Sequence, residues 1–172
     1  MGAAANALIK GVDVEDVTRH LDSFYCYHLT RVHYALALKA RLEGQAAFLL
    51  GEGELDEVLE DSLAAVRKLA DRVGDLGGEV TADPALTVAA SPFDAFSMPP
   101  SNSDVGAILT HALEGTRTIV SAYGAFLERV RGRDDVSHRL VVGLLEKEAH
   151  RESDIEAALA GPAVRRASGG GA

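Results

Sequence analysis

Four stretches of the chain are apolar at helical spacing, and each carries a polar side chain within that pattern. These polar positions are His20 in the first stretch, Ser62 in the second, Thr116 in the third, and Glu148 with Arg151 in the fourth. Buried polar groups are costly unless they are paired, so such side chains tend to meet in a folded core. The pattern predicts a shared polar layer across the centre of a helical bundle.

The types of these side chains suggest two opposite kinds of chemistry. Glu148 is a hard oxygen ligand for divalent cations, and His20 could add an imidazole nitrogen. Arg151 argues against a metal, because a guanidinium stays protonated and has no lone pair to donate. Arg151 follows Glu148 by one helical turn, so the two can form an ion pair that fills the space instead.

Helical periodicity and capping residues predict the elements that position this layer. Asp13 and Ser103 are candidate N-caps of the first and third helices, and Gly77-Gly78 is a candidate end of the second. Either Gly44 or Gly51 could end the first helix. The expected helices run from Asp13 to one of these glycines, from Leu55 to Leu76, from Val105 to Val130 and from about Asp135 to Leu159.

The connections between these helices are unequal in length. Residues 79–102 contain four of the five prolines and show no sustained period. A connection this long inside a compact domain is expected to cross the bundle from one end to the other. The sequence therefore predicts an all-α, ferritin-like four-helix bundle with a long crossover between the second and third helices. Residues 13–160 would form the bundle, residues 1–12 an N-terminal arm, and residues 161–172 a disordered Gly/Ala-rich tail.

Composition limits the function classes. A chain of 172 residues is long enough for one domain with a real core, and a net charge of −9 argues against binding to nucleic acid phosphates. The single Cys26 cannot form an internal disulfide. No apolar stretch is long enough to span a bilayer, and the first ten residues do not resemble a signal peptide. We expect a cytoplasmic protein with no membrane partner.

Several local sequences are similar to one known family. Residues 90–105, with the sequence ASPFDAFSMPPSNSDV, resemble the crossover of the Dps-like branch of the ferritin superfamily. The likeness extends from about His20 to Leu159. Its other parts are the aromatic run at residues 24–27, Glu60-Asp61, Leu76-Gly77-Gly78, residues 112–114, Tyr123 and the turn at residues 132–134.

This resemblance implies a di-iron centre and also shows where the chain departs from it. Ferritin-like bundles build that centre from one Glu on each of two helices and a Glu-x-x-His motif on each of the other two. Only the fourth-helix glutamate is kept. Carried over by position, His20 replaces the first-helix carboxylate, Asp61 and Ala65 replace the second-helix motif, Thr116 replaces the third-helix carboxylate, and Arg151 follows Glu148 in place of the histidine.

The hypothesis we favour is a self-associating, Dps-like scaffold or storage protein in which the iron-oxidising centre is lost or altered. No cofactor would then be needed, and Ser62, Thr116 and Arg151 would belong to a structural polar layer. An altered iron site would use His20, Asp61 and Glu148 as its metal ligands. Catalysis is the less favoured interpretation.

Two alternatives remain open from the sequence. In one, the protein binds iron and oxidises ferrous ions or consumes peroxide, at a remodelled site or at one between subunits. In the other, the vacated space binds a small anionic ligand, which Arg151 could pair with.

Overall fold

Four long helices dominate the computed structural model, which describes residue 9, residues 11–51, 53–92 and 98–161, and residue 164. Those residues contain no strand. The long helices are α2 (Val14–Lys39), α4 (Glu54–Asp75), α6 (Val105–Val130) and α7 (Asp135–Ala160). Two short helices, α3 (Gly44–Leu50) and α5 (Pro84–Ala90), lie in the connections.

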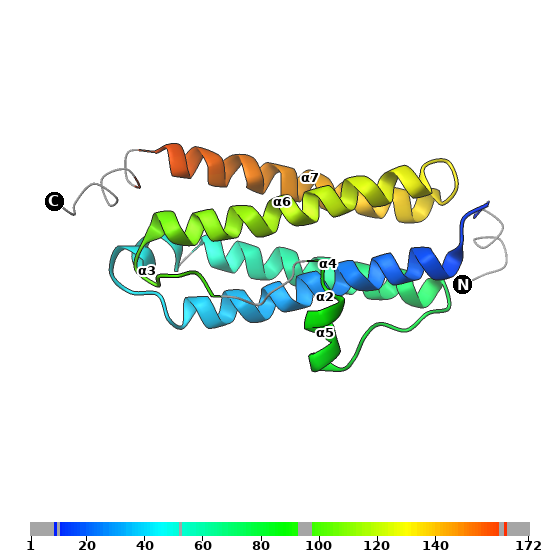
Figure 1. The fold of residues 1–172 in the computed structure, drawn as a ribbon, viewed down its shortest axis with the longest axis horizontal. Coiled ribbons are helices and arrows are strands. Elements are labelled where there is room, and N and C mark those ends of the chain that lie inside the picture. Colours follow the sequence, from blue (N-terminus) through cyan, green and yellow to red (C-terminus); the bar gives the residue numbers. More distant parts are fainter. Residues whose placement is uncertain (1–8, 10, 52, 93–97, 162–163, 165–172) are drawn as a thin grey trace.

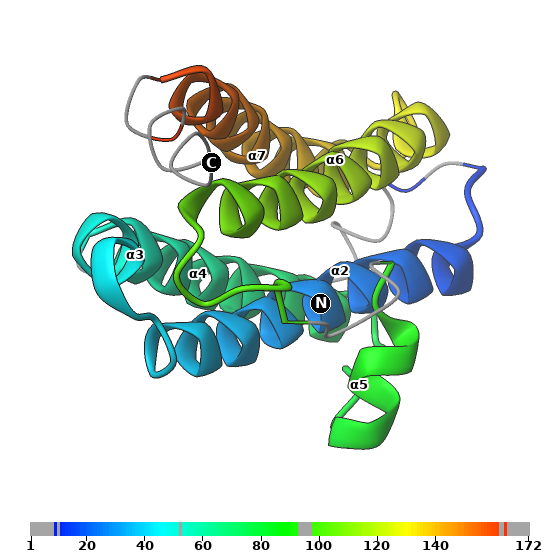
Figure 2. The same ribbon diagram turned by 60° about the vertical axis from the view of Figure 1, so that its left-hand side comes forward.

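The long helices form two hairpins that pack into one bundle (Figures 1 and 2). Helix α2 packs mainly on α4, and α6 mainly on α7. The chain between α4 and α6 returns along the bundle to its other end, with α5 against α2 on the way. The predicted all-α bundle with a long crossover is confirmed. None of the described helices is long and apolar enough to cross a membrane.

The connections differ in detail from the expectation. Helix α2 already ends at Lys39, before either candidate glycine, and Gly44 instead begins α3 with a φ of 56°, which glycine adopts at little cost. The crossover contains α5, where Asp83 accepts a hydrogen bond from the amide of Ala85 and Pro84 takes the first helical position.

The N-cap of α6 is Asp104 and not Ser103. Its carboxylate accepts a hydrogen bond from the amide of Ala107 at 3.1 Å. The domain limits at both ends of the chain stay predictions, because the arm (residues 1–12) and the tail (residues 161–172) lie mostly outside the described residues, as do residues 93–97 of the family-like run.

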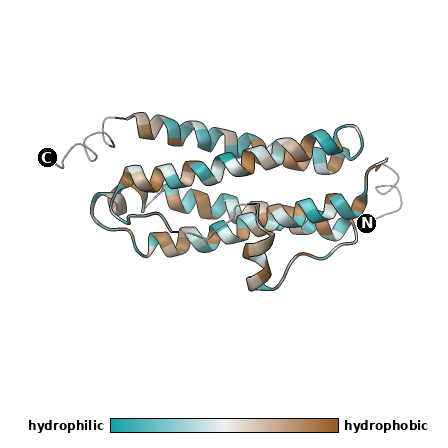
Figure 3. Cartoon of the chain, viewed as in Figure 1, coloured by the Kyte–Doolittle hydropathy of each residue, from teal (hydrophilic) through white to brown (hydrophobic). Residues whose placement is uncertain are grey.

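The apolar core consists of two clusters of buried side chains rather than one. One cluster surrounds Phe24, Leu69 and Tyr123, and the other surrounds Leu38 and Ile108. On α2 and α4, the residues between the two clusters include polar ones, among them Arg31 and Ser62. Figure 3 shows hydrophilic and hydrophobic residues interspersed along all the long helices. The core is therefore divided near its middle.

A buried polar contact lies at the end of the bundle where α6 is followed by α7. The guanidinium of Arg72 donates from Nη2 to both carboxylate oxygens of Asp134 at 2.9 Å, and from Nε to the hydroxyl of Ser137 at 2.9 Å. Asp134 also caps α7 by accepting from the amide of Ser137. All three side chains are buried. Burial raises the pKa of Asp134, but the hydrogen bonds from Ser137 and the charge of Arg72 outweigh it, so the pKa is lowered.

We predict that Asp134→Asn lowers the free energy of unfolding by about 3 kcal/mol or more, since it leaves the buried charge of Arg72 without its partner. Asp135→Asn is the matched control, because Asp135 is the next residue and is exposed. It should change stability by no more than about 0.5 kcal/mol. Urea unfolding of both variants measures the difference, and equal effects would show that the contact contributes little.

Candidate functional site

The centre of the bundle holds a buried arginine–glutamate pair. Arg31 of α2 donates to Glu148 of α7 through two parallel hydrogen bonds of 2.8 Å, one from each terminal nitrogen. Only 11% of the Arg31 side chain and 3% of the Glu148 side chain are exposed. Such a bidentate pair is among the strongest hydrogen-bonded contacts that side chains make. It joins the two hairpins across the middle of the bundle.

The same guanidinium contacts α4 directly and is linked to α6 through Tyr27. Its Nε donates to the hydroxyl of Ser62 on α4 at 2.9 Å, and Nη1 donates to the hydroxyl of Tyr27 at 3.1 Å. The Tyr27 hydroxyl in turn donates a long hydrogen bond of 3.5 Å to the carbonyl of Gly115 on α6. Arg31 is thus the hub of a network that includes all four long helices.

Arg151 extends this network toward the surface. It donates to Glu148 at 3.4 Å, one turn before it on α7, and to Asp61 of α4 at 3.0 Å. Asp61 also accepts from Lys147. We call Arg31, Asp61, Lys147, Glu148 and Arg151 the ion-pair cluster; it contains three cations and two carboxylates.

The cluster keeps Glu148 ionised. Burial raises the pKa of Glu148, but the charge and hydrogen bonds of Arg31, together with the charge of Arg151, lower it further than burial raises it. The net result is a pKa of about 2. The pKa of Asp61 is also lowered, because Lys147 and Arg151 outweigh the effect of its burial.

A neutral histidine lies next to the cluster. His28 is 2% exposed, and its Nε2 lies 2.6 Å from the hydroxyl of Tyr123. Burial, followed by the charge of Arg31, lowers the pKa of His28 to about 3. Its Nδ1 has no hydrogen-bond partner within the described part of the chain. The imidazole therefore contributes no charge to this region near neutral pH.

Of the three residues predicted as metal ligands, the structure brings two near each other. Asp61 and Glu148 both bind Arg151. His20 packs instead against the ring of Phe126, and its Nδ1 lies 2.7 Å from the carbonyl of Asp16. On α2, His20 precedes Arg31 by about 16 Å of helix, so it lies outside the cluster.

The residues predicted for a polar layer lie around the same centre. Ser62 and Arg151 belong to the network, and Thr116 is 3% exposed and lines a cavity beside it. Sequence reasoning missed Arg31, which follows Tyr27 by one turn within the apolar stripe of the first helix. A charged residue inside such a stripe was the signal that could have found it, since a buried charge requires a partner.

The side chains present do not fit a pair of iron ions. Both oxygens of Glu148 and both oxygens of Asp61 accept hydrogen bonds from cationic side chains. Two guanidinium groups, which cannot bind metal, touch the one glutamate. Among the described residues, no group of three or more His, Cys, Asp or Glu side chains is placed to hold a metal ion.

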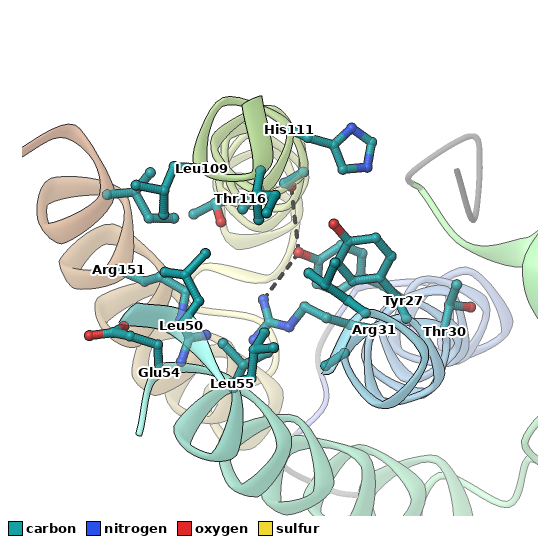
Figure 4. Close-up of a pocket in the computed structure, with 18 of the residues that line it drawn as sticks. Tyr27, Thr30, Arg31, Leu50, Glu54, Leu55, Leu109, His111, Thr116 and Arg151 are labelled. Carbon is teal, nitrogen blue, oxygen red and sulfur yellow. Dashed lines mark hydrogen bonds between the residues drawn. The ribbon is translucent and has the colours of Figure 1, made fainter. Parts of the chain in front are cut away.

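An apolar cavity of about 130 Å³ adjoins the cluster, between the long helices (Figure 4). Tyr27, Leu55 and Leu109 line it, and Arg31 and Arg151 lie at its polar side. The cavity therefore combines apolar walls with the positive charges of Arg31 and Arg151. The carboxylates of the cluster, Asp61 and Glu148, are already paired with cations.

No protein-family model matches the sequence, and neither does any curated protein. Solved structures do match. The bacterioferritin-related protein of Bacteroides fragilis, described as a dodecameric thioferritin, is 19% identical over 98% of each chain, with a TM-score of 0.83. Dps from Staphylococcus aureus is 16% identical over 87% of this chain and 98% of its own, with a TM-score of 0.77.

Dps from Vibrio cholerae O1, described as a member of a broad superfamily of ferritin-like diiron-carboxylate proteins, gives a TM-score of 0.75. It is 14% identical over 87% of this chain and 94% of its own. The three matches cover 87% to 98% of this chain. This chain therefore has the ferritin-like fold of the bacterioferritin-related and Dps proteins.

Proposed function

We propose that this protein is a cytoplasmic, self-assembling ferritin-like subunit that acts as a scaffold or storage shell and does not oxidise iron at its bundle centre. The observation that carries this proposal is the bidentate Arg31–Glu148 pair. In ferritin-like di-iron proteins, carboxylates and histidines project into the bundle core to hold two metal ions. Here an arginine binds the carboxylate instead.

Electrostatics support this proposal. Two unit charges of the same sign that lie 4 Å apart near a protein surface repel each other by about 4 kcal/mol. A divalent ion bound to Glu148 would lie near both Arg31 and Arg151, and it would displace at least one of their hydrogen bonds. Metal binding would therefore cost more here than in a site built from carboxylates and histidines.

Self-assembly is supported by the surface and by the structural neighbours. The Bacteroides fragilis protein is described as dodecameric, and the match covers 98% of each chain. Several large apolar side chains are exposed on this subunit, including Phe48 at 84%, Leu86 at 58% and Leu36 at 53%. Self-association would remove such side chains from water.

We predict that the purified protein oxidises aerobic ferrous iron no faster than buffer alone, because the cluster offers no open ligand set. Absorbance of ferric species over time measures the rate, and metal analysis of the protein before the titration measures bound iron. Glu148→Ala and His20→Ala should leave both values unchanged. The contrary result, near-stoichiometric iron that both variants lose, would establish an active metal site and overturn the proposal.

Fast oxidation of ferrous iron that neither Glu148→Ala nor His20→Ala affects would indicate a site outside the bundle centre. It would favour the alternative function, an iron-oxidising or peroxide-consuming site between subunits. Size-exclusion chromatography with light scattering, performed on the same samples, separates these cases, because an inter-subunit site requires the oligomer. If the site lies between subunits, the rate of iron oxidation should fall at dilutions that dissociate the assembly. A site within one subunit should keep its rate.

We predict that removal of the two guanidinium groups makes the bundle centre receptive to metal. The double variant Arg31→Glu with Arg151→His would add a carboxylate and an imidazole beside Glu148. Its melting temperature should rise when Mn²⁺ or Co²⁺ is added, whereas that of the wild type should not. The control pair, Arg117→Glu with Arg129→His, changes exposed residues to the same types. If neither metal raises the melting temperature of the Arg31→Glu, Arg151→His variant, the two guanidinium charges are not what prevents metal binding.

We predict a pH dependence that comes from Glu148. Its folded pKa of about 2 lies below the ordinary value of 4.5, so the folded state binds its proton less readily than the unfolded state. The associated stability is present above about pH 5 and is lost as the pH falls toward 2. Between pH 6 and pH 3, the wild type should lose about 2 kcal/mol more than Glu148→Gln does.

Urea unfolding at the two pH values measures this difference. Glu152→Gln is the matched control, because Glu152 lies one turn further along α7, pairs with Arg117 and is more exposed. Its pH dependence should match that of the wild type. If Glu148→Gln also matches the wild type, the Arg31–Glu148 pair does not hold the pKa down.

A further inference from the structure

We propose that the apolar cavity beside the ion-pair cluster binds a small carboxylic acid with an apolar body, about the size of benzoate, and that Arg151 binds its carboxylate. This inference rests on the proposed function, because it requires Arg151 to be free of competition from a metal at this position. It goes beyond the scaffold role by assigning a ligand class to the space left at the bundle centre.

The size and lining of the cavity set the apolar part of the ligand. Its volume is about 130 Å³, and its walls include Leu38, Leu55 and Ile108. A cavity of about 150 Å³ with aliphatic and aromatic walls can hold one benzene ring. The atoms around an empty apolar space lack dispersion contacts that a ring of this size would supply. A polar ligand of the same volume would lose hydrogen bonds to water that these apolar walls cannot replace.

Unused donors on Arg151 set the polar part of the ligand. A guanidinium has five N–H groups, and Arg151 uses one from each terminal nitrogen, toward Glu148 and Asp61. The hydrogen bonds that it makes to the described residues come from Nη1 and Nη2 and not from Nε. The side chain is only 14% exposed, and it lines the cavity. A carboxylate in the cavity could accept from the donors that remain, as planar carboxylates do from arginine.

The charge balance favours an anion over a neutral molecule. The ion-pair cluster has three cations against two carboxylates, so one further carboxylate would balance it. Thr116 is a second polar residue in the lining of the cavity, and it is 3% exposed. Glu54 is the acidic residue at the rim; it is exposed and forms no ion pair with Arg151.

Calorimetric titration of the full chain with benzoate at about pH 7 tests the proposal. Benzamide has the same ring without the charge, and acetate has the charge without the ring. Benzoate should bind, and benzamide should bind about tenfold more weakly or worse, as expected when a charged hydrogen bond is lost. Acetate should show no binding over the same concentration range. This comparison needs no variant and is therefore independent of folding defects.

Two variants locate the site. Arg151→Gln removes the proposed anchor, while Glu148 keeps Arg31 and Asp61 keeps Lys147 as partners. Ala112→Leu places a larger side chain on a wall of the cavity. Both should weaken benzoate binding about tenfold or more. Arg117→Gln is the matched control, because Arg117 is an exposed arginine that also binds two carboxylates, and it should bind benzoate like the wild type.

The outcomes separate this inference from the proposed function. Absence of benzoate binding, equal binding of benzamide, or full binding to Ala112→Leu with an intact melting transition would each overturn the ligand assignment. None of these results would affect the iron experiment, which tests the proposed function by itself. Stoichiometric iron at the cluster, with benzoate binding lost when iron is present, would instead overturn the proposed function.

Discussion

A charge buried at the centre of a bundle must find its counter-charge there, because its removal from water costs several kcal/mol that only a well-formed pair can offset. Arg31 and Glu148 meet this condition from opposite hairpins. Each terminal nitrogen of Arg31 donates a hydrogen bond of 2.8 Å to one carboxylate oxygen of Glu148. A shift of either helix by one residue would separate them. The pair therefore fixes the register between the hairpins, which apolar side chains alone specify less strictly.

The division of the core follows from this constraint. Apolar side chains cannot pack through a layer of guanidinium and carboxylate groups, so they gather into one cluster on each side of it. The first cluster is built around the aromatic side chains of Phe24, Tyr123 and Phe126, with ring centroids 4.7 and 5.5 Å apart. The second has smaller aliphatic side chains, and the cavity lies at its border with the cluster.

The fold was predictable from the sequence because it depends on local signals. Helical periodicity, the Asp13 cap and the proline-rich crossover each act within a few residues, and together they leave one plausible connectivity. The short helices α3 and α5 were missed because seven residues are too few for a period to be recognised. The central site was harder, since it depends on which helix faces meet.

His20 and Arg31 illustrate that difficulty. Both lie in the apolar stripe of the first helix, and the sequence alone does not tell which of them is level with Glu148. The structure places Arg31 there, and only tertiary contacts could show this. By contrast, the spacing of Glu148 and Arg151 was enough to predict their contact, because one turn of helix brings them together in any fold.

The composition of the ion-pair cluster also bears on how the subunit matures. A bundle whose centre is held by metal completes that part of its structure only when the ion is supplied, since metal binding and folding are coupled. Here every charge at the centre is encoded in the chain itself, from Arg31 to Arg151. Under the function proposed above, a newly synthesised chain would reach its final packing without a supply of iron.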